Sequence, residues 1–85
     1  MTNLEKLVEN TIYTKRSKFK TNLARIRKDS GLSQSQLAEA SEINVRMIQH
    51  YEQGSKDINK ASAITIYKIA KALGCTVEDL LELEK

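Results

Sequence analysis

The segment SEINVRMIQHYEQG, residues 41–54, concentrates hydrogen-bonding side chains on one predicted face of a short helix. If Ile43, Ile48 and Tyr51 turn inward, amide, guanidinium and imidazole groups point outward. Such groups bind another molecule by donating and accepting hydrogen bonds. The outward set, which also includes a valine, comprises Asn44, Val45, Arg46, Gln49 and His50.

The chain lacks the residue clusters that catalysis or metal binding requires. His50 is its only histidine and Cys75 its only cysteine, and no Cys/His cluster of metal-ligand spacing or glycine-rich phosphate loop is present. These two residues are predicted to lie on different helices. We therefore expect no enzymatic activity, no metal and no cofactor.

Positive charge gathers before and within the first predicted helix. The net charge is +3, but no acid interrupts residues 10–28, whereas the tail TVEDLLELEK is acidic. This asymmetry favours a polyanion as partner, with a solvated lysine-rich face as the alternative. The basic residues of this stretch are Lys15, Arg16, Lys18, Lys20, Arg25, Arg27 and Lys28.

Length and composition predict one small all-α domain. The 85 residues suffice for one domain, and the content of 40% apolar and 29% charged residues is typical of a globular chain. The absence of proline and tryptophan favours helices packed by aliphatic side chains over a β-sandwich. No apolar run reaches about 18 residues, the N-terminus shows no signal-peptide core, and a single cysteine fits a reducing cytosol. We expect a cytoplasmic protein that does not enter the membrane.

Caps, glycines and apolar periodicity divide the chain into five predicted helices. They span residues 20–30, 34–41, 45–53, 60–73 and 77–83. The starting side chains are Ser33 with Gln36, Asn44, Asp57 or Asn59, and Thr76 with Asp79, and the glycines at helix ends are Gly31, Gly54 and Gly74. The predicted inward residues are Leu23, Ile26, Leu37, Ala38, Ile48, Tyr51, Ile66, Ile69, Ala70, Leu73, Leu80 and Leu81.

Residues 1–19 are predicted to be an N-terminal extension of the domain formed by residues 20–85. Thr2 and Glu5 make a further capping box, and the apolar residues up to Ile12 share one face. This pattern predicts a short additional helix. An extended arm over TIYTKRSKF is the alternative.

The second and third predicted helices are separated by so few residues that they must cross sharply. The stretch LSQSQLAEASEINVRMIQHYEQG resembles the helix-turn-helix of the phage-repressor and Cro type, in the XRE-like family of bacterial and phage regulators. The opening L-S-Q-x-x-L-A, the inward isoleucine of the third helix and the ending Y-E-x-G carry the resemblance. IYKIAKALGCTVEDLLEL resembles the closing helices of that family. The resemblance covers about residues 21–83 and implies a compact five-helix repressor-like domain.

The resemblance also implies sequence-specific binding of double-stranded DNA by a transcriptional regulator, with the third helix in the major groove. The positions that match base contacts are Asn44, Val45, Arg46, Gln49 and His50. Gln34 matches a phosphate contact, and further candidates for phosphate contacts are Ser33, Gln53, Lys56 and Lys60. The family's ion pair between the first and third helices maps onto Arg27 and Glu52.

Two features depart from the family pattern. Glu42 occupies the turn position where the family usually has glycine, and a left-handed backbone there would cost about 1 kcal/mol. The loop SKDINKASA is also a few residues longer than usual.

Two questions about partners stay open in the sequence. The rival function is a protein-interaction module, such as an antitoxin or anti-repressor partner, built on the same fold. A homodimer is expected, through either the N-terminal segment or Leu80, Leu81 and Leu83, although both regions could instead only close the core.

Overall fold

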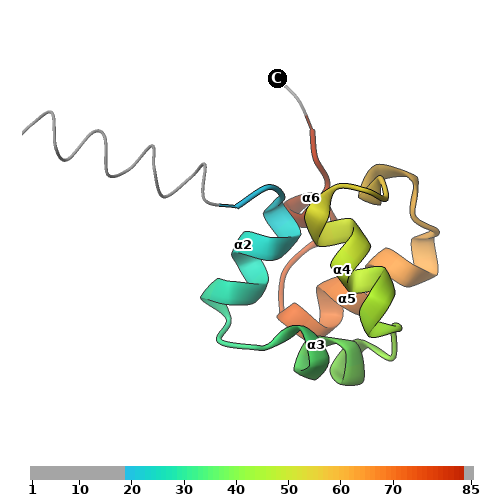
Figure 1. Cartoon of the computed structure of the whole chain (residues 1–85). Coiled ribbons are helices and arrows are strands. Elements are labelled where there is room, and N and C mark those ends of the chain that lie inside the picture. Colours follow the sequence, from blue (N-terminus) through green and yellow to red (C-terminus); the bar gives the residue numbers. More distant parts are fainter. Residues whose placement is uncertain (1–18, 84–85) are drawn as a thin grey trace, which may run out of the picture.

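The structure is a computed structural model that describes residues 19–83, and helices are the regular elements within this range (Figure 1). This confirms the all-α fold class, and the predicted helix near the N-terminus lies outside the described residues. No helix within residues 19–83 is long and apolar enough to cross a membrane. The elements are α2 (Asn22–Asp29), α3 (Gln34–Ser41), α4 (Val45–Gln53), a 3₁₀ helix η1 (Ile58–Lys60), α5 (Ala63–Leu73) and α6 (Val77–Leu80).

Side-chain caps define where α3 and α6 begin, at the positions predicted from the sequence. The Ser33 hydroxyl accepts a hydrogen bond from the Gln36 N–H at 3.0 Å, while the Gln36 Oε1 accepts one from the Ser33 N–H at 2.8 Å. Thr76 and Asp79 repeat this capping box on α6. The hydrogen bond from the Thr76 N–H lowers the pKa of the Asp79 carboxyl from its ordinary value.

The turn between α3 and α4 has a left-handed backbone at a residue other than glycine. Glu42 has φ 62° and ψ 32°, and its N–H satisfies the carbonyls of Ala38 and Glu39 at the end of α3. The left-handed conformation is where an L side chain crowds its own backbone. The Glu42 carboxylate lies 3.7 Å from the Lys68 Nζ, but this pair is largely exposed and contributes little stability.

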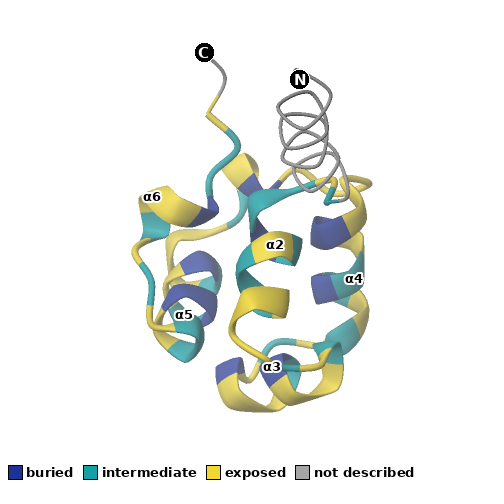
Figure 2. Ribbon diagram, turned by 90° about the vertical axis from the view of Figure 1, so that its left-hand side faces the viewer, coloured by how far each residue is buried: buried dark blue, intermediate teal, exposed yellow. Residues whose placement is uncertain are grey.

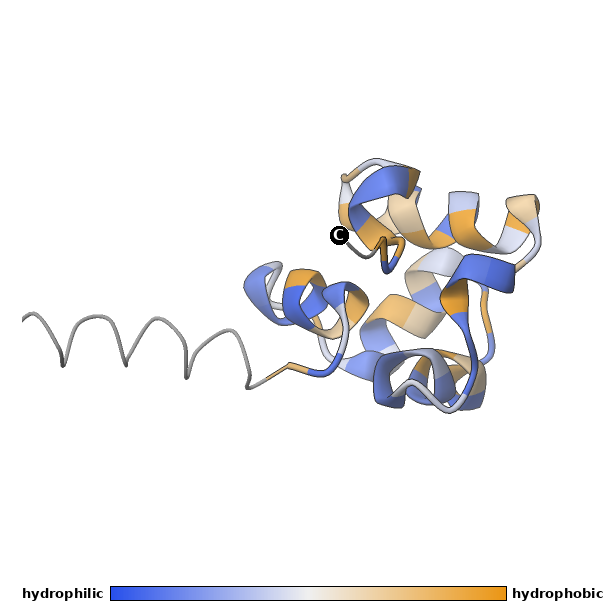
Figure 3. Ribbon diagram, turned by 90° about the horizontal axis from the view of Figure 1, so that it is seen from above, coloured by the Kyte–Doolittle hydropathy of each residue, from blue (hydrophilic) through white to orange (hydrophobic). Residues whose placement is uncertain are grey.

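The core takes one fully buried aliphatic side chain from each of the five α-helices. The buried residues lie on the sides of the helices that face one another (Figure 2), and hydrophobic and hydrophilic residues alternate along the ribbons (Figure 3). Burial of each such side chain contributes about 1.5–3 kcal/mol of transfer free energy. These five residues are Leu23, Leu37, Ile48, Ile69 and Leu80.

The prediction was wrong about the start of α5, which begins at Ala63 and not at residue 60. The preceding residues form η1, which Asp57 caps and which buries Ile58 to 3% exposure. The Ser62 hydroxyl then caps α5 by accepting a hydrogen bond from the Thr65 N–H. The longer loop therefore forms a separate turn with its own core side chain.

The prediction was also wrong at the other two helices whose bounds differ. α6 ends at Leu80 and not at residue 83. Glu82 is drawn away from the helix because the Asn59 side chain binds its backbone N–H at 2.8 Å and its carbonyl at 3.0 Å. α2 begins two residues later than predicted because the Thr21 hydroxyl caps it by accepting a hydrogen bond from the Ala24 N–H, and it ends one residue earlier, with Ser30 as its C-cap.

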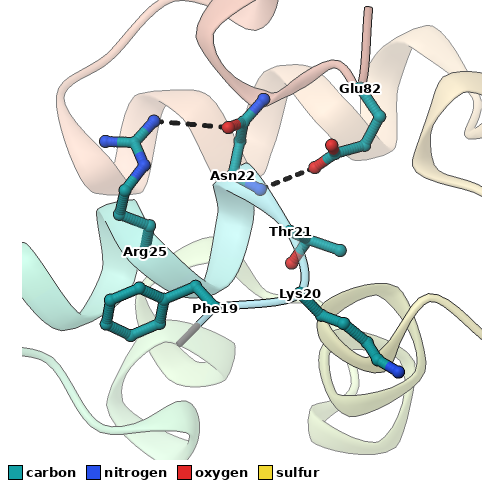
Figure 4. A pocket seen from close by; sticks show the side chains of 6 residues that line it. All are labelled: Phe19, Lys20, Thr21, Asn22, Arg25 and Glu82. Atoms are coloured by element: carbon teal, nitrogen blue, oxygen red, sulfur yellow. Dashed lines mark hydrogen bonds between the residues drawn. The ribbon is translucent and has the colours of Figure 1, made fainter. Parts of the chain in front are cut away.

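The segment after α6 packs against the start of α2. The Asn22 N–H donates to the Glu82 carboxylate at 2.6 Å, and the Asn22 side chain donates to the Leu81 carbonyl at 2.8 Å. Glu82, Asn22 and Arg25 line a polar cavity (Figure 4), whose volume is about 520 Å³. Leu80 is fully buried while Leu83 is 64% exposed, so of the three tail leucines one closes the core and one faces solvent.

Cys75 lies at the corner between α5 and α6. Its side chain is half-buried and packs against the core. This burial, with a smaller effect of the Asp79 charge, raises the pKa of the Cys75 thiol. The thiol is therefore protonated at neutral pH.

Candidate nucleic-acid interface

α3 and α4 form a compact pair joined by three residues. The bounds of both helices are those predicted from the sequence. The left-handed Glu42 reverses the chain, the Ile43 N–H donates to the Ala38 carbonyl at 3.1 Å, and the Asn44 side chain caps α4 through the Arg46 N–H at 2.7 Å. α3 lies across one end of the molecule in both views, with α4 rising from it (Figures 1 and 2). This arrangement is that of a helix-turn-helix.

α4 has one buried and one exposed side, as its sequence predicts. Ile48, Tyr51 and Glu52 are buried. Arg46 and His50 are exposed, while Val45 and Gln49 are half-buried beside them. The outward set of the sequence analysis therefore lies on the side of α4 that the protein leaves accessible, and its contacts with bases remain a prediction.

Arg27 on α2 and Glu52 on α4 form an ion pair below this surface. The Arg27 Nε lies 2.5 Å from the Glu52 Oε2, and the Arg27 Nη2 lies 3.1 Å from the Glu52 Oε1. The two side chains are only 11% and 6% exposed. The Arg27 Nη1 also donates to the Leu32 carbonyl at 2.8 Å, and the Thr21 hydroxyl donates to the Glu52 carbonyl at 3.1 Å. The pair thus joins α2, α4 and the segment that leads into α3.

The side chain of Gln34 connects this ion pair to the exposed side of α4. Its Nε2 donates to the Glu52 Oε1 at 2.9 Å, and its Oε1 accepts from the Gln49 Nε2 at 3.4 Å. The sequence analysis missed this contact. The only signal in the sequence was that Gln34 lies on one helix, and Gln49 and Glu52 lie on the next. The short turn between these helices brings them into close contact.

His50 is held at the end of α4 by the following loop. Its Nδ1 lies 2.9 Å from the Ser55 hydroxyl, and its carbonyl accepts a hydrogen bond from the Lys56 N–H at 3.2 Å. The hydrogen bond at Nδ1 therefore fixes the orientation of the imidazole ring, and the Nε2 has no hydrogen-bond partner within residues 19–83.

The predicted phosphate contacts lie at the two ends of the helix pair. Ser33 and Gln34 are at the start of α3, where the capping box leaves the N–H groups of Gln34 and Ser35 for another partner. Gln53 ends α4, and Lys56 lines a cavity of about 360 Å³ between the following loop and Lys20. Lys60 is exposed at the end of η1.

The described residues offer no ready metal site, since residues 19–83 contain no group of three or more His, Cys, Asp or Glu placed to hold an ion.

Residues 23–80, more than half of the chain, match the family model described as helix-turn-helix. A comparison with curated proteins finds no match.

Proposed function

Since the chain belongs to the helix-turn-helix family of the Cro and phage-repressor type, we propose that it is a transcriptional regulator that binds a specific sequence of double-stranded DNA. A bacterial or phage regulator of this kind acts in the cytoplasm, where its operators lie. The exposed side of α4 carries the proposal. It presents a guanidinium, an amide and an imidazole, and no acid.

In this proposal α4 lies in the major groove with its first turns against the base edges. Arg46 is suited to bond bidentately to the O6 and N7 of guanine, and Gln49 or Asn44 to the N6 and N7 of adenine. Val45 can contact a thymine methyl group. His50 can bond to a purine N7 through its outer nitrogen.

Phosphate contacts on both sides of α4 would fix its position in the groove. The free N–H groups at the start of α3 favour an anion, because the positive end of the helix dipole lies there. The Ser33 hydroxyl and the backbone of Gln34 would bind one phosphate. Gln53, Lys56 and Lys60 would bind phosphates beyond the other end of α4.

The salt dependence of binding to duplex DNA tests the proposal. Neutralisation of two phosphates by Lys56 and Lys60 predicts that log K falls with log salt with a slope of roughly −1.8 for each protomer. Lys56→Gln should make this slope shallower by about one, whereas Lys71→Gln, which removes an exposed lysine from α5, should leave it unchanged.

Affinity for duplex DNA that hardly changes with salt would contradict the proposal. Such behaviour would favour the protein-interaction module, in which the chain itself acts as an antitoxin or anti-repressor-type partner of another protein. A fluorescence anisotropy titration at several salt concentrations separates the two functions.

A further inference from the structure

Four side chains from three helices form a continuous series of hydrogen bonds that ends on the accessible side of α4. Arg27 binds the Glu52 carboxylate, Glu52 accepts from Gln34, and Gln34 accepts from Gln49. We call this series the amide relay. The side chains of Arg27 and Glu52 are only 11% and 6% exposed, whereas Gln49 borders the surface that the proposed function places against DNA.

The ion pair sets the direction of every bond along the amide relay. A guanidinium only donates and a carboxylate only accepts, so the Gln34 side chain must face Glu52 with its NH₂ group. The Gln34 carbonyl oxygen then faces Gln49, which must answer with its own NH₂ group. A flip of either amide would place two acceptor oxygens against each other in a partly buried contact, which is unfavourable.

The fixed direction decides what Gln49 presents to a ligand. One of its two N–H bonds is directed at Gln34, which leaves its carbonyl oxygen and the other N–H as one acceptor beside one donor. Adenine presents the complementary pair in the major groove, a donor at N6 beside an acceptor at N7. Guanine presents acceptors at both O6 and N7, so its O6 would meet the Gln49 oxygen.

We propose that Gln34 is a positioning residue for specificity, which holds the Gln49 amide in the orientation that pairs with adenine. The inference rests on the proposed DNA binding and adds the base that Gln49 selects and the reason for that choice. It also assigns adenine to Gln49 in preference to Asn44. The Asn44 Oδ1 already accepts the Arg46 N–H at 2.7 Å as the cap of α4.

The side-chain amide resonances of the free protein test the amide relay without DNA. Gln34→Met keeps the length of the side chain but removes both polar atoms, so the Gln49 NH₂ resonances should shift. Gln53→Met, which removes an amide one turn further along α4, should leave them in place. Unmoved Gln49 resonances in a folded Gln34→Met protein would overturn the inference, and this result would not bear on DNA binding itself.

Selection from random duplexes tests the consequence for specificity. The Gln49→Ala variant identifies the base pair that Gln49 contacts, because adenine preference is lost only there. Gln34→Met should reduce the preference for adenine at that same pair by roughly tenfold, and should have no further effect there in the Gln49→Ala background. Gln53→Met should keep the preference at that pair.

Other outcomes would overturn the inference. If Gln34→Met weakens binding to all sequences equally, Gln34 contacts a phosphate or only supports the fold, and it does not position Gln49. Retention of the full adenine preference would have the same meaning. Gln34→Ala provides a second truncation if a circular dichroism spectrum shows that the methionine variant is unfolded. If the unaltered protein binds no duplex, the proposed function fails along with the specificity, while the resonances still report on the amide relay.

Discussion

Glu52 is a carboxylate that the fold buries and then supplies with partners on two sides. Arg27 makes two hydrogen bonds to it and Gln34 makes a third. A buried charge is tolerated when its partners replace the water that it loses. Removal of one partner is therefore more damaging than loss of the same contact at the surface.

We predict that Glu52→Ala lowers the free energy of unfolding by about 3 kcal/mol or more, because it strands the Arg27 guanidinium in a nearly buried position. Urea unfolding followed by circular dichroism measures the loss. Asp29→Ala is the matched control, since its pair with Arg25 spans 4.0 Å and is largely exposed. It should cost about 1 kcal/mol or less. Equal losses in the two variants would show that the buried pair contributes no more than the exposed one.

Arg46 is the exposed guanidinium in the first turn of α4, the part of the helix that would meet base edges. Arg46→Ala should weaken binding to the selected site by about 1–3 kcal/mol and relax the preference at one base pair. Competition between the selected duplex and random duplexes measures both effects. Arg25→Ala, an exposed arginine on α2, should leave the base preference intact. If Arg46→Ala reduces affinity for both duplexes equally, Arg46 contacts only phosphate.

At the scale of the elements, side-chain caps account for where sequence reasoning succeeded. α3 and α4 have the predicted bounds because Ser33 and Asn44 cap them locally, and Glu42 and Gly54 end them in the left-handed conformation. Signals of this kind lie within a few residues of the helix end and can be found in the sequence alone.

The end of α6, which was predicted wrongly, depends on a contact between distant segments. α6 stops early because Asn59, 23 positions before Glu82 in the sequence, binds the backbone that would continue it. The amide relay was missed for the same reason, since Gln34 and Glu52 are 18 positions apart. Only the packing of α2, α3 and α4 brings these side chains together.

The left-handed turn at Glu42 gives a prediction about the helix pair. Glu42→Gly should raise the free energy of unfolding by up to about 1 kcal/mol, because glycine adopts this backbone without strain. The melting temperature should then rise by roughly 4–8 °C per kcal/mol. Loss of the exposed contact with Lys68 should offset little of this gain, and Lys68→Ala, which removes the contact alone, is the control. An unchanged or lower melting temperature for Glu42→Gly would contradict this reading of the turn.

At the scale of the whole molecule, one helix pair covers few base pairs, and so we predict that the protein binds DNA as a homodimer. The selected sequence should contain two related half-sites with centres about 34 Å apart, or a multiple of that distance. Leu83 is one exposed apolar residue that could contribute to the dimer contact. Analytical ultracentrifugation with a one-half-site and a two-half-site duplex measures the stoichiometry. A single asymmetric site bound by one protomer would contradict the prediction.

The protonated thiol of Cys75 at the corner between α5 and α6 also has an experimental use. Alkylating reagents attack the thiolate, so the raised pKa and the half-buried position both slow the reaction in the closed molecule. Since the chain contains no other cysteine, the labelling rate reports on one place. A comparison of that rate with and without DNA would show whether DNA bound at α4 reduces local unfolding around Cys75.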